Sequence, residues 1–404
     1  MPGETQEIVA WAVQAGLEGL GHGELTAGYC ERLVEAGVPL WRASMGADTL
    51  HPLIDAQGQR WVAGEGVREE IYIRQSSPES EQEWLQSPWH RMVQDRSWEM
   101  RRRLAIGEGT NEFPLLARLA AQGATDYWAR IMRYGEQAHI GEGKGIATSF
   151  STREPEGFAA EHLATIEATL PAFALAYKAT MTLDTARTLV TTYLGSDAAE
   201  RILRGEIDRG QVKTLRKVLW FSDLAGFTRI ADTLAREQLL DLLNAYAEGL
   251  VRVIHDHGGE VLKFMGDGLL AVFDGAADHA CERALDAAWA ARSAIDRLNQ
   301  RREAGGLTVT NFTLALHAGE VLSGNVGSQE RLDFTVVGPA VNEVARIQAM
   351  SRSLDQPIVV SASFAAACGE QRARLVSLGR YALRGVGRPQ ELFTLDLAAA
   401  DGQR

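Results

Sequence analysis

The stretch Val218–Thr228 reads VLWFSDLAGFT, and the later stretch Val261–Phe273 reads VLKFMGDGLLAVF. Each has an aspartate, Asp223 or Asp267, at the end of an apolar run with the length and composition of a buried strand. Alone, such an aspartate is typical of a turn or a helix N-cap. Mg²⁺ takes one or two carboxylates and completes its shell with water and substrate phosphates. Two aspartates at strand ends therefore suit divalent ions acting on a nucleotide.

A third segment, Phe334–Arg346, reads FTVVGPAVNEVAR. Gly338 and Pro339 predict the start of a helix, and Asn342 and Arg346, four residues apart, would project from one face of it. The three segments together, in this order, resemble the class III nucleotidyl cyclases, which make cyclic AMP or cyclic GMP. The resemblance covers roughly residues 212 to 396.

The resemblance implies a role for each matching residue. Asp223, Asp267 and the backbone of Leu224 would hold two Mg²⁺ or Mn²⁺ ions per active site. The turn at Gly226, with Phe227 and Thr228, would cradle the triphosphate, since glycine permits a close backbone approach and helix N-termini favour anions. Asn342 would orient the ribose, and Arg346 would stabilise charge on the α-phosphate.

Two further positions are implied to read the purine. Lys263, which alone would be an ordinary exposed strand lysine, is a donor that suits adenine N1. Thr335 matches the position where many adenylate cyclases carry aspartate; a hydroxyl there marks the class IIIb subgroup and can accept from the adenine amino group. Guanylate cyclases typically carry an acceptor in place of this lysine. The pair therefore predicts ATP rather than GTP as substrate.

One position departs from the pattern of some relatives. They carry an arginine that contacts phosphate where this chain has Thr313. That contact is either missing here or supplied by Arg384.

The order of elements in this half predicts a βαββαβ, ferredoxin-like domain of mixed α/β (α+β) class over residues 215–397, with its helices on one face of the sheet. We expect one helix from about 228 to 255, a hairpin over 260–273, a second helix over 277–302, and strands over 310–316 and 321–324. A tail follows over 398–404.

Tryptophan usage separates the first half, because seven of the nine tryptophans lie between Trp11 and Trp128. Alternating strand patterns and a helix from about 159 to 177 resemble a GAF-like α+β sensor domain over 1–181. Any α+β domain with an aromatic core would show a similar pattern. Residues 182–214 carry apolar residues at helical spacing and resemble a helical transducer; a plain linker is the alternative.

Composition limits the surroundings of the protein. A net charge of −12 argues against binding to nucleic acid or to an anionic membrane surface. The first thirty residues show no signal-peptide pattern, and Cys30, Cys281 and Cys368 have no metal-ligand spacing. These features predict a cytoplasmic protein with reduced thiols.

The sequence thus predicts a homodimeric adenylate cyclase that forms cyclic AMP and pyrophosphate from ATP, regulated by an effector that binds the N-terminal domain. The resemblance implies that each active site lies at the subunit interface, with metal aspartates from one chain and Lys263, Thr335, Asn342 and Arg346 from its partner. Guanylate cyclase activity and a catalytically weak nucleotide-binding module remain alternatives. A diguanylate cyclase is disfavoured, because its hairpin reads Gly-Gly-Asp/Glu-Glu-Phe rather than the sequence around Asp267. The sequence does not identify the effector.

Overall fold

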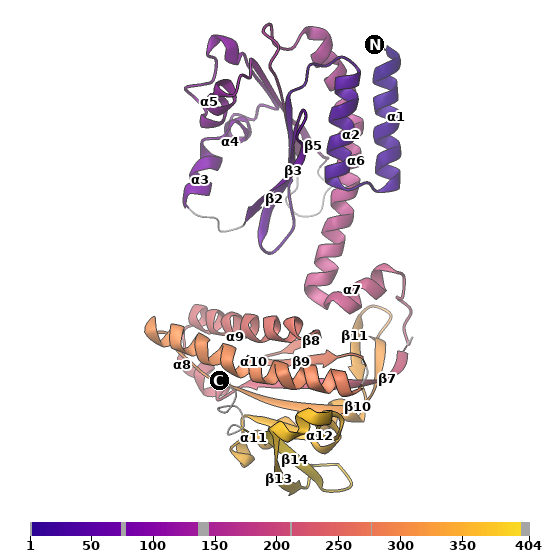
Figure 1. Cartoon of the computed structure of the whole chain (residues 1–404), viewed down its shortest axis with the longest axis vertical. Coiled ribbons are helices and arrows are strands. Elements are labelled where there is room, and N and C mark those ends of the chain that lie inside the picture. The colour runs from indigo at the N-terminus through magenta and orange to yellow at the C-terminus, as the bar shows by residue number, and fades with distance from the viewer. Residues whose placement is uncertain (1, 74–77, 136–144, 211, 276, 397–404) are drawn as a thin grey trace. The chain divides into compact units, whose positions relative to one another are not determined.

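The computed structural model of the chain describes residues 2–73, 78–135, 145–210, 212–275 and 277–396 (Figure 1). The predicted tail over 398–404 lies outside the described residues. The chain divides into two compact units, Met1–Leu189 and Val190–Arg404, and each is described by itself.

The N-terminal unit is built on a six-stranded antiparallel sheet. The strand order is β3-β2-β1-β6-β5-β4. The alternating segments that predict strands around Trp41, Tyr72, Trp128 and Phe150 all contribute to it. The strands are β1 (Arg42–Asp48), β2 (Ile54–Val62), β3 (Gly66–Ile73), β4 (Glu99–Arg102), β5 (Asp126–Arg133) and β6 (Gly145–Thr152).

Helices cover both faces of this sheet (Figure 1). One face packs against α1 (Pro2–Glu18), α2 (His22–Glu35) and α6 (Ala160–Leu194), around a core that includes Tyr29, Trp128 and Phe173. The other face carries α3 (Pro78–Leu85), α4 (Pro88–Gln94), the 3-10 turn η1 (Leu104–Ile106) and α5 (Pro114–Ala121), around a core that includes Met92, Leu116 and Tyr127. The unit is therefore an α+β domain with an aromatic core; its assignment as GAF-like stays a prediction.

Helix α6 is longer than predicted, since it continues past residue 177 to Leu194. No glycine or proline lies between Lys178 and Leu194 to end it, and Pro171 is accommodated inside the helix. The helix ends where Gly195 adopts a positive φ of 86°. The segment predicted as a transducer thus begins inside α6, and α7 (Ser196–Leu203) follows it.

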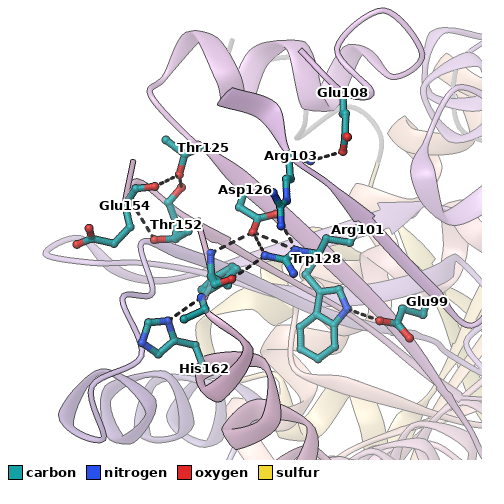
Figure 2. Close-up of polar contacts among 12 residues, drawn as sticks. Glu99, Arg101, Arg103, Glu108, Thr125, Asp126, Trp128, Thr152, Glu154 and His162 are labelled. Carbon is teal, nitrogen blue, oxygen red and sulfur yellow. Dashed lines mark hydrogen bonds and ion pairs between the residues drawn. The ribbon is translucent and has the colours of Figure 1, made fainter. Parts of the chain in front are cut away.

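A buried ion pair holds the residues just before α6 in place, as Figure 2 shows. The Arg101 guanidinium donates to both oxygens of Asp126, with a shortest distance of 2.6 Å. The Phe158 amide donates to Asp126 at 3.0 Å, and Arg101 donates to the Phe158 carbonyl at 2.7 Å. These contacts join β4, β5 and the residues just before α6. Water has little access to them, because the Asp126 side chain is only 1% exposed.

The C-terminal unit has an eight-stranded sheet. Seven strands follow the order β13-β14-β12-β10-β7-β9-β8, and β11 pairs with β10. The chain order from β7 to β10 is the predicted βαββαβ order. The strands are β7 (Val212–Leu224), β8 (Gly259–Met265), β9 (Gly268–Phe273), β10 (Phe312–Gly327), β11 (Leu332–Val337), β12 (Ile358–Ser361), β13 (Leu375–Tyr381) and β14 (Gln390–Leu395).

Helices lie on both faces of this sheet as well, so the expectation of helices on one face alone is wrong. The apolar sides of α8 (Phe227–Thr233), α9 (Arg236–Asp256), α10 (Ala277–Ala304) and α12 (Ala362–Ala367) pack on the face that carries Trp220. Helix α11 (Pro339–Leu354) packs on the opposite face, against Leu219 and Leu270. A 3-10 turn, η2 (Gly369–Arg374), precedes β13.

Two predicted elements of this unit have different bounds. The single helix expected over 228–255 is two helices, because Leu234 and Ala235 are both extended. The two strands expected over 310–324 form the one strand β10, with no turn at Gly319. A Cβ on Gly319 would lie 2.6 Å from the Ala340 Cβ, so this glycine permits close packing of α11 on the strand.

Among the described residues, no helix combines the length and the apolar character that crossing a membrane requires.

Candidate active site

Asp223 lies near the end of β7, a central strand of the sheet. Side chains alternate along a strand, so Asp223 shares a face with Leu219 and Phe221, which pack toward α11. The Thr313 hydroxyl of the neighbouring strand β10 donates to the Asp223 carbonyl at 3.3 Å. The chain then turns at Gly226, where φ is 68°, and α8 begins at Phe227. Phe227 packs against the core, and Thr228 is exposed.

Asp267 is brought to Asp223 by the tight turn between β8 and β9. Met265 and Gly268 are partners across the hairpin, and Gly266 between them has a φ of 68°. A Cβ on Gly268 would lie 3.3 Å from the Ser222 carbonyl oxygen and 3.6 Å from Asp223 Oδ1. A glycine at this position therefore lets the hairpin turn lie directly against the end of β7.

The two carboxyl groups are close enough to interact strongly. Burial, a hydrogen bond to Asp267 and the negative charge of Asp267 together raise the pKa of Asp223 to about 7. The Leu224 N–H and the charge of Arg352 act in the opposite direction. Such crowding of like charges holds a proton between two carboxylates unless a cation replaces it.

The donor set fits a divalent cation of the magnesium type. Two carboxylates are what Mg²⁺ usually takes from a protein, and the adjacent backbone carbonyls add hard oxygen ligands. Across the described residues, no group of three or more His, Cys, Asp or Glu side chains is arranged to hold a metal ion. An ion at Asp223 and Asp267 would therefore take its remaining ligands from backbone, water and substrate.

Lys263 on β8 forms an ion pair that its sequence context alone did not reveal. Its Nζ lies 3.1 Å from Asp333 Oδ2 on β11. Lys263 pairs across the hairpin with Leu270, which faces α11, so the lysine lies on the same sheet face as Asp223. Asp333 was missed because it lies seventy residues away in the sequence; its position two residues before Thr335 was the available signal.

Thr335 is buried beside this pair. Two residues after Asp333 on β11, it has the same facing as Asp333. Its side chain is 6% exposed, and its hydroxyl has no hydrogen-bond partner among the described residues. A buried hydroxyl without a partner is costly, which is the behaviour expected of a group that a ligand completes.

Helix α11 carries the remaining predicted residues. It begins at Pro339 after Gly338, as predicted, with Asn342 exposed and Arg346 partly buried. A Cβ on Gly385 would lie 3.3 Å from the Arg346 guanidinium nitrogens, so the loop just after Arg384 runs close to Arg346. Arg384 itself is exposed.

Thr313, the position that departs from some relatives, forms hydrogen bonds to two other residues of the chain. Gln348 of α11 donates to its hydroxyl at 2.7 Å, while that hydroxyl donates to the Asp223 carbonyl. This chain of contacts joins α11 to the backbone that carries Asp223. Within the described residues of one chain, no hydrogen bond or ion pair joins Asn342 or Arg346 to the two aspartates.

Comparison with known proteins identifies a family for the C-terminal part of the chain. Residues 213–396 match the family described as the adenylate and guanylate cyclase catalytic domain. An adenylate cyclase of Anabaena cylindrica is 31% identical over 161 residues, which are 39% of this chain and 32% of that protein. Adenylate cyclase 1 of Rhizobium meliloti is 28% identical over 154 residues, 37% of this chain and 23% of that protein. The match thus spans less than a third of the length of these relatives.

Similar solved structures include both kinds of cyclase. The adenylyl cyclase CyaB from P. aeruginosa is 27% identical, with a TM-score of 0.41, and the match covers 45% of this chain and 95% of that one. The guanylyl cyclase Cya2 is 29% identical, with a TM-score of 0.41, and the match covers 46% and 93%. From the family match and its curated relatives, residues 213–396 form a domain of the adenylate and guanylate cyclase catalytic family.

Proposed function

We propose that this domain converts ATP to 3′,5′-cyclic AMP and pyrophosphate. The observation that carries the proposal is the contact between the Asp223 and Asp267 carboxyl groups, on the sheet face where Lys263 also lies. In the reaction, the ribose 3′-oxygen attacks the α-phosphorus and loses its proton. The bond from the α-phosphorus to the bridging oxygen breaks, and pyrophosphate leaves with that electron pair.

We assign the two aspartates and the Leu224 carbonyl as ligands of Mg²⁺ or Mn²⁺, two ions per active site. Bound there, the ions would supply Lewis acidity that lowers the pKa of the ribose hydroxyl and offsets charge on the phosphates. The two aspartates would fix where that charge is placed, because one lies near the end of β7 and the other in the β8–β9 turn. Phe227 and Thr228 open α8. Their N–H groups have no partner within the helix and would donate to a phosphate bound at this turn.

Lys263 and Thr335 would select adenine. The lysine donates to N1, and the buried Thr335 hydroxyl accepts from the amino group, which satisfies an oxygen that otherwise lacks a partner. Asn342 would orient the ribose. Arg346 would place its planar, permanently charged guanidinium against the α-phosphate as charge develops there.

The proposed active form is a homodimer with shared sites. Each chain carries both sets of residues, and Asp223 and Asp267 of one chain would face Lys263, Thr335, Asn342 and Arg346 of its partner. The lack of any hydrogen bond or ion pair between Arg346 and the two aspartates, within the described residues of one chain, supports this arrangement. Exposed apolar side chains lie beside the site residues and would be covered on dimerisation; they are Phe264, Met265, Leu322, Val326 and Leu332.

One observation favours a second candidate, guanylate cyclase activity. The Asp333 carboxylate beside Lys263 is an acceptor that could bond to guanine N1–H and the guanine amino group, while Lys263 donates to O6. Thr335 lies deeper than Asp333, since it is buried and Asp333 is about half exposed. We therefore rank ATP first.

We further propose that the N-terminal unit senses an effector and regulates the domain through the segment 182–214. Three free, buried cysteines support a reducing, cytoplasmic setting. The proposed chemistry is tested by incubating the purified chain with Mn²⁺ and ATP. Equal amounts of cyclic AMP and pyrophosphate are expected, and the Asp267→Asn variant should form neither. Activity of Asp267→Asn near the wild-type level would refute the metal assignment.

A further inference from the structure

The N-terminal unit contains a basic pocket unrelated to the cyclase domain. It has a volume of about 520 Å³, within the range of small-molecule sites. Four arginines and one glutamate line it, beside Trp41 and the turn between β2 and β3. The charged lining residues are Arg42, Arg60, Arg68, Arg153 and Glu65.

Strand register places three of these arginines on one face of the sheet. Ser44 of β1 is paired with Arg60 of β2, and Arg60 is paired with Arg68 of β3. Arg42 lies two residues before Ser44, so it shares their facing. Three guanidinium groups on neighbouring strands repel one another in the absence of compensating anions.

The charges of these arginines are only partly compensated. Arg60 pairs with Glu70 at 3.2 Å, and Arg68 pairs with Glu65 at 3.3 Å. Arg153 stacks over the Trp41 ring at 4.0 Å. Both ion pairs are partly exposed to solvent, so they neutralise the pocket weakly.

Arg42 provides an independent sign that a ligand binds here. Its side chain is 93% buried, since only 7% of the residue is exposed, and its Nη1 has no hydrogen-bond partner among the described residues. Ser151 of β6 is paired with Arg42 of β1 and is fully buried. Its hydroxyl also lacks a hydrogen-bond partner in the described part of the chain. Burial lowers the pKa of Arg42, yet a guanidinium keeps its charge. A buried guanidinium with an unsatisfied N–H group is unfavourable for folding alone.

We infer that this pocket binds a small anionic molecule that carries phosphate or carboxylate groups, with Arg42 as its buried contact. Arg60 and Arg68 would add charge-assisted hydrogen bonds from the neighbouring strands. The inference rests on the proposed sensory role of the N-terminal unit and names the chemical class of its effector. It does not depend on the proposed cyclase activity, because ligand binding is measured directly.

Isothermal titration of the full chain, without divalent metal and in chloride buffer, tests this site. The probes are inorganic phosphate, fructose 1,6-bisphosphate and citrate, which separate phosphate from carboxylate ligands. We expect at least one to bind once per chain. Arg42→Met should weaken that binding at least about tenfold, and Arg68→Gln should weaken it about threefold. Arg118→Gln, an exposed arginine outside the pocket lining, should leave it unchanged.

Thermal melts separate a ligand-binding role from a structural one. Without probe, Arg42→Met should melt at or above the wild-type temperature, because it removes a buried charge that has no full set of partners. A structural arginine would instead lower the melting temperature. If Arg42→Met fails to fold, the binding measurement on Arg68→Gln tests the site instead. That variant should fold normally, because the Arg68 side chain is 68% exposed. Failure of all three probes to bind, or wild-type affinity in Arg42→Met and Arg68→Gln, would overturn the inference.

Discussion

Lys263 of β8 and Asp333 of β11 form a 3.1 Å ion pair that joins the metal-site hairpin to the strand that carries Thr335. Both side chains are more than a third exposed, so the pair contributes little to stability. Its consequence is positional, because the Asp333 carboxylate holds the Lys263 ammonium group close to β11.

The first prediction concerns this pair. Asp333→Asn should raise the KM for ATP about threefold to tenfold, because Lys263 loses the carboxylate that positions it, with little change in melting temperature. It should not increase the use of GTP, because it removes the carboxylate that could accept from guanine. Steady-state kinetics with both nucleotides measure this, and Glu330→Gln, an exposed change in the same hairpin, is the control. A lower KM in Asp333→Asn would mean that Asp333 withholds Lys263 from substrate.

The second prediction follows from the raised pKa of Asp223. Its ordinary value is 3.8 and its value in the folded, metal-free chain is about 7. A carboxyl group whose folded pKa is raised adds stability below its ordinary pKa and loses that contribution as pH rises through the folded value. The metal-free protein should therefore lose stability between about pH 4 and pH 7, and the loss should level off above pH 7.

Thermal melts in EDTA across this pH range test it. Asp223→Asn should show a shallower decline than wild type. Mn²⁺ should also bind wild type more weakly at pH 6 than at pH 8, by up to about tenfold per pH unit below 7, because the ion competes with a proton. Identical pH dependence in wild type and Asp223→Asn would contradict the coupled carboxyl pair.

The third prediction concerns the shared site. Asp223→Ala and Arg346→Ala homodimers should each lose at least about a hundredfold in turnover. In a mixed dimer, one site collects both lesions and the other collects neither. Mixing the two variants under conditions of subunit exchange should restore up to half of the wild-type activity per heterodimer.

Arg346→Ala should also bind ATP nearly as well as wild type, because it acts on charge that develops in the transition state. Subunit exchange is followed with differently tagged chains, and the Asp223→Ala, Arg346→Ala double variant mixed with itself is the control. Demonstrated exchange without recovered activity would show that the groups do not come from opposite chains.

The fourth prediction concerns the ion pair in Figure 2. Asp126→Ala removes the acceptor of Arg101 and of the Phe158 amide, and it should cost about 3 kcal/mol of unfolding free energy. Asp95→Ala, which removes the exposed pair with Arg91, should lower the free energy of unfolding far less. Denaturant unfolding of the two variants measures the difference, and equal effects would refute the structural role of Asp126.

Local chemistry made parts of the site predictable. The Gly-Asp-Gly turn at Asp267 and the Gly-Pro start of α11 are each specified by a few adjacent residues. The Lys263–Asp333 pair was not predictable, because it depends on how two strands far apart in the sequence are arranged. Two separate strands were predicted on either side of Gly319, whereas β10 continues through it. This glycine allows close packing against Ala340, a contact that no local pattern encodes. The length of α6 was missed because only Gly195, well past the predicted end, terminates it.

Product analysis with competing substrates tests the central proposal most directly. Purified chain is incubated with Mn²⁺ and equal concentrations of ATP and GTP, and the products are separated and identified by mass spectrometry. The account predicts 3′,5′-cyclic AMP with pyrophosphate, cyclic GMP in clear minority, and neither product from Asp223→Ala. Unchanged nucleotides, cyclic GMP in equal or greater amount, or full activity of Asp223→Ala would contradict it.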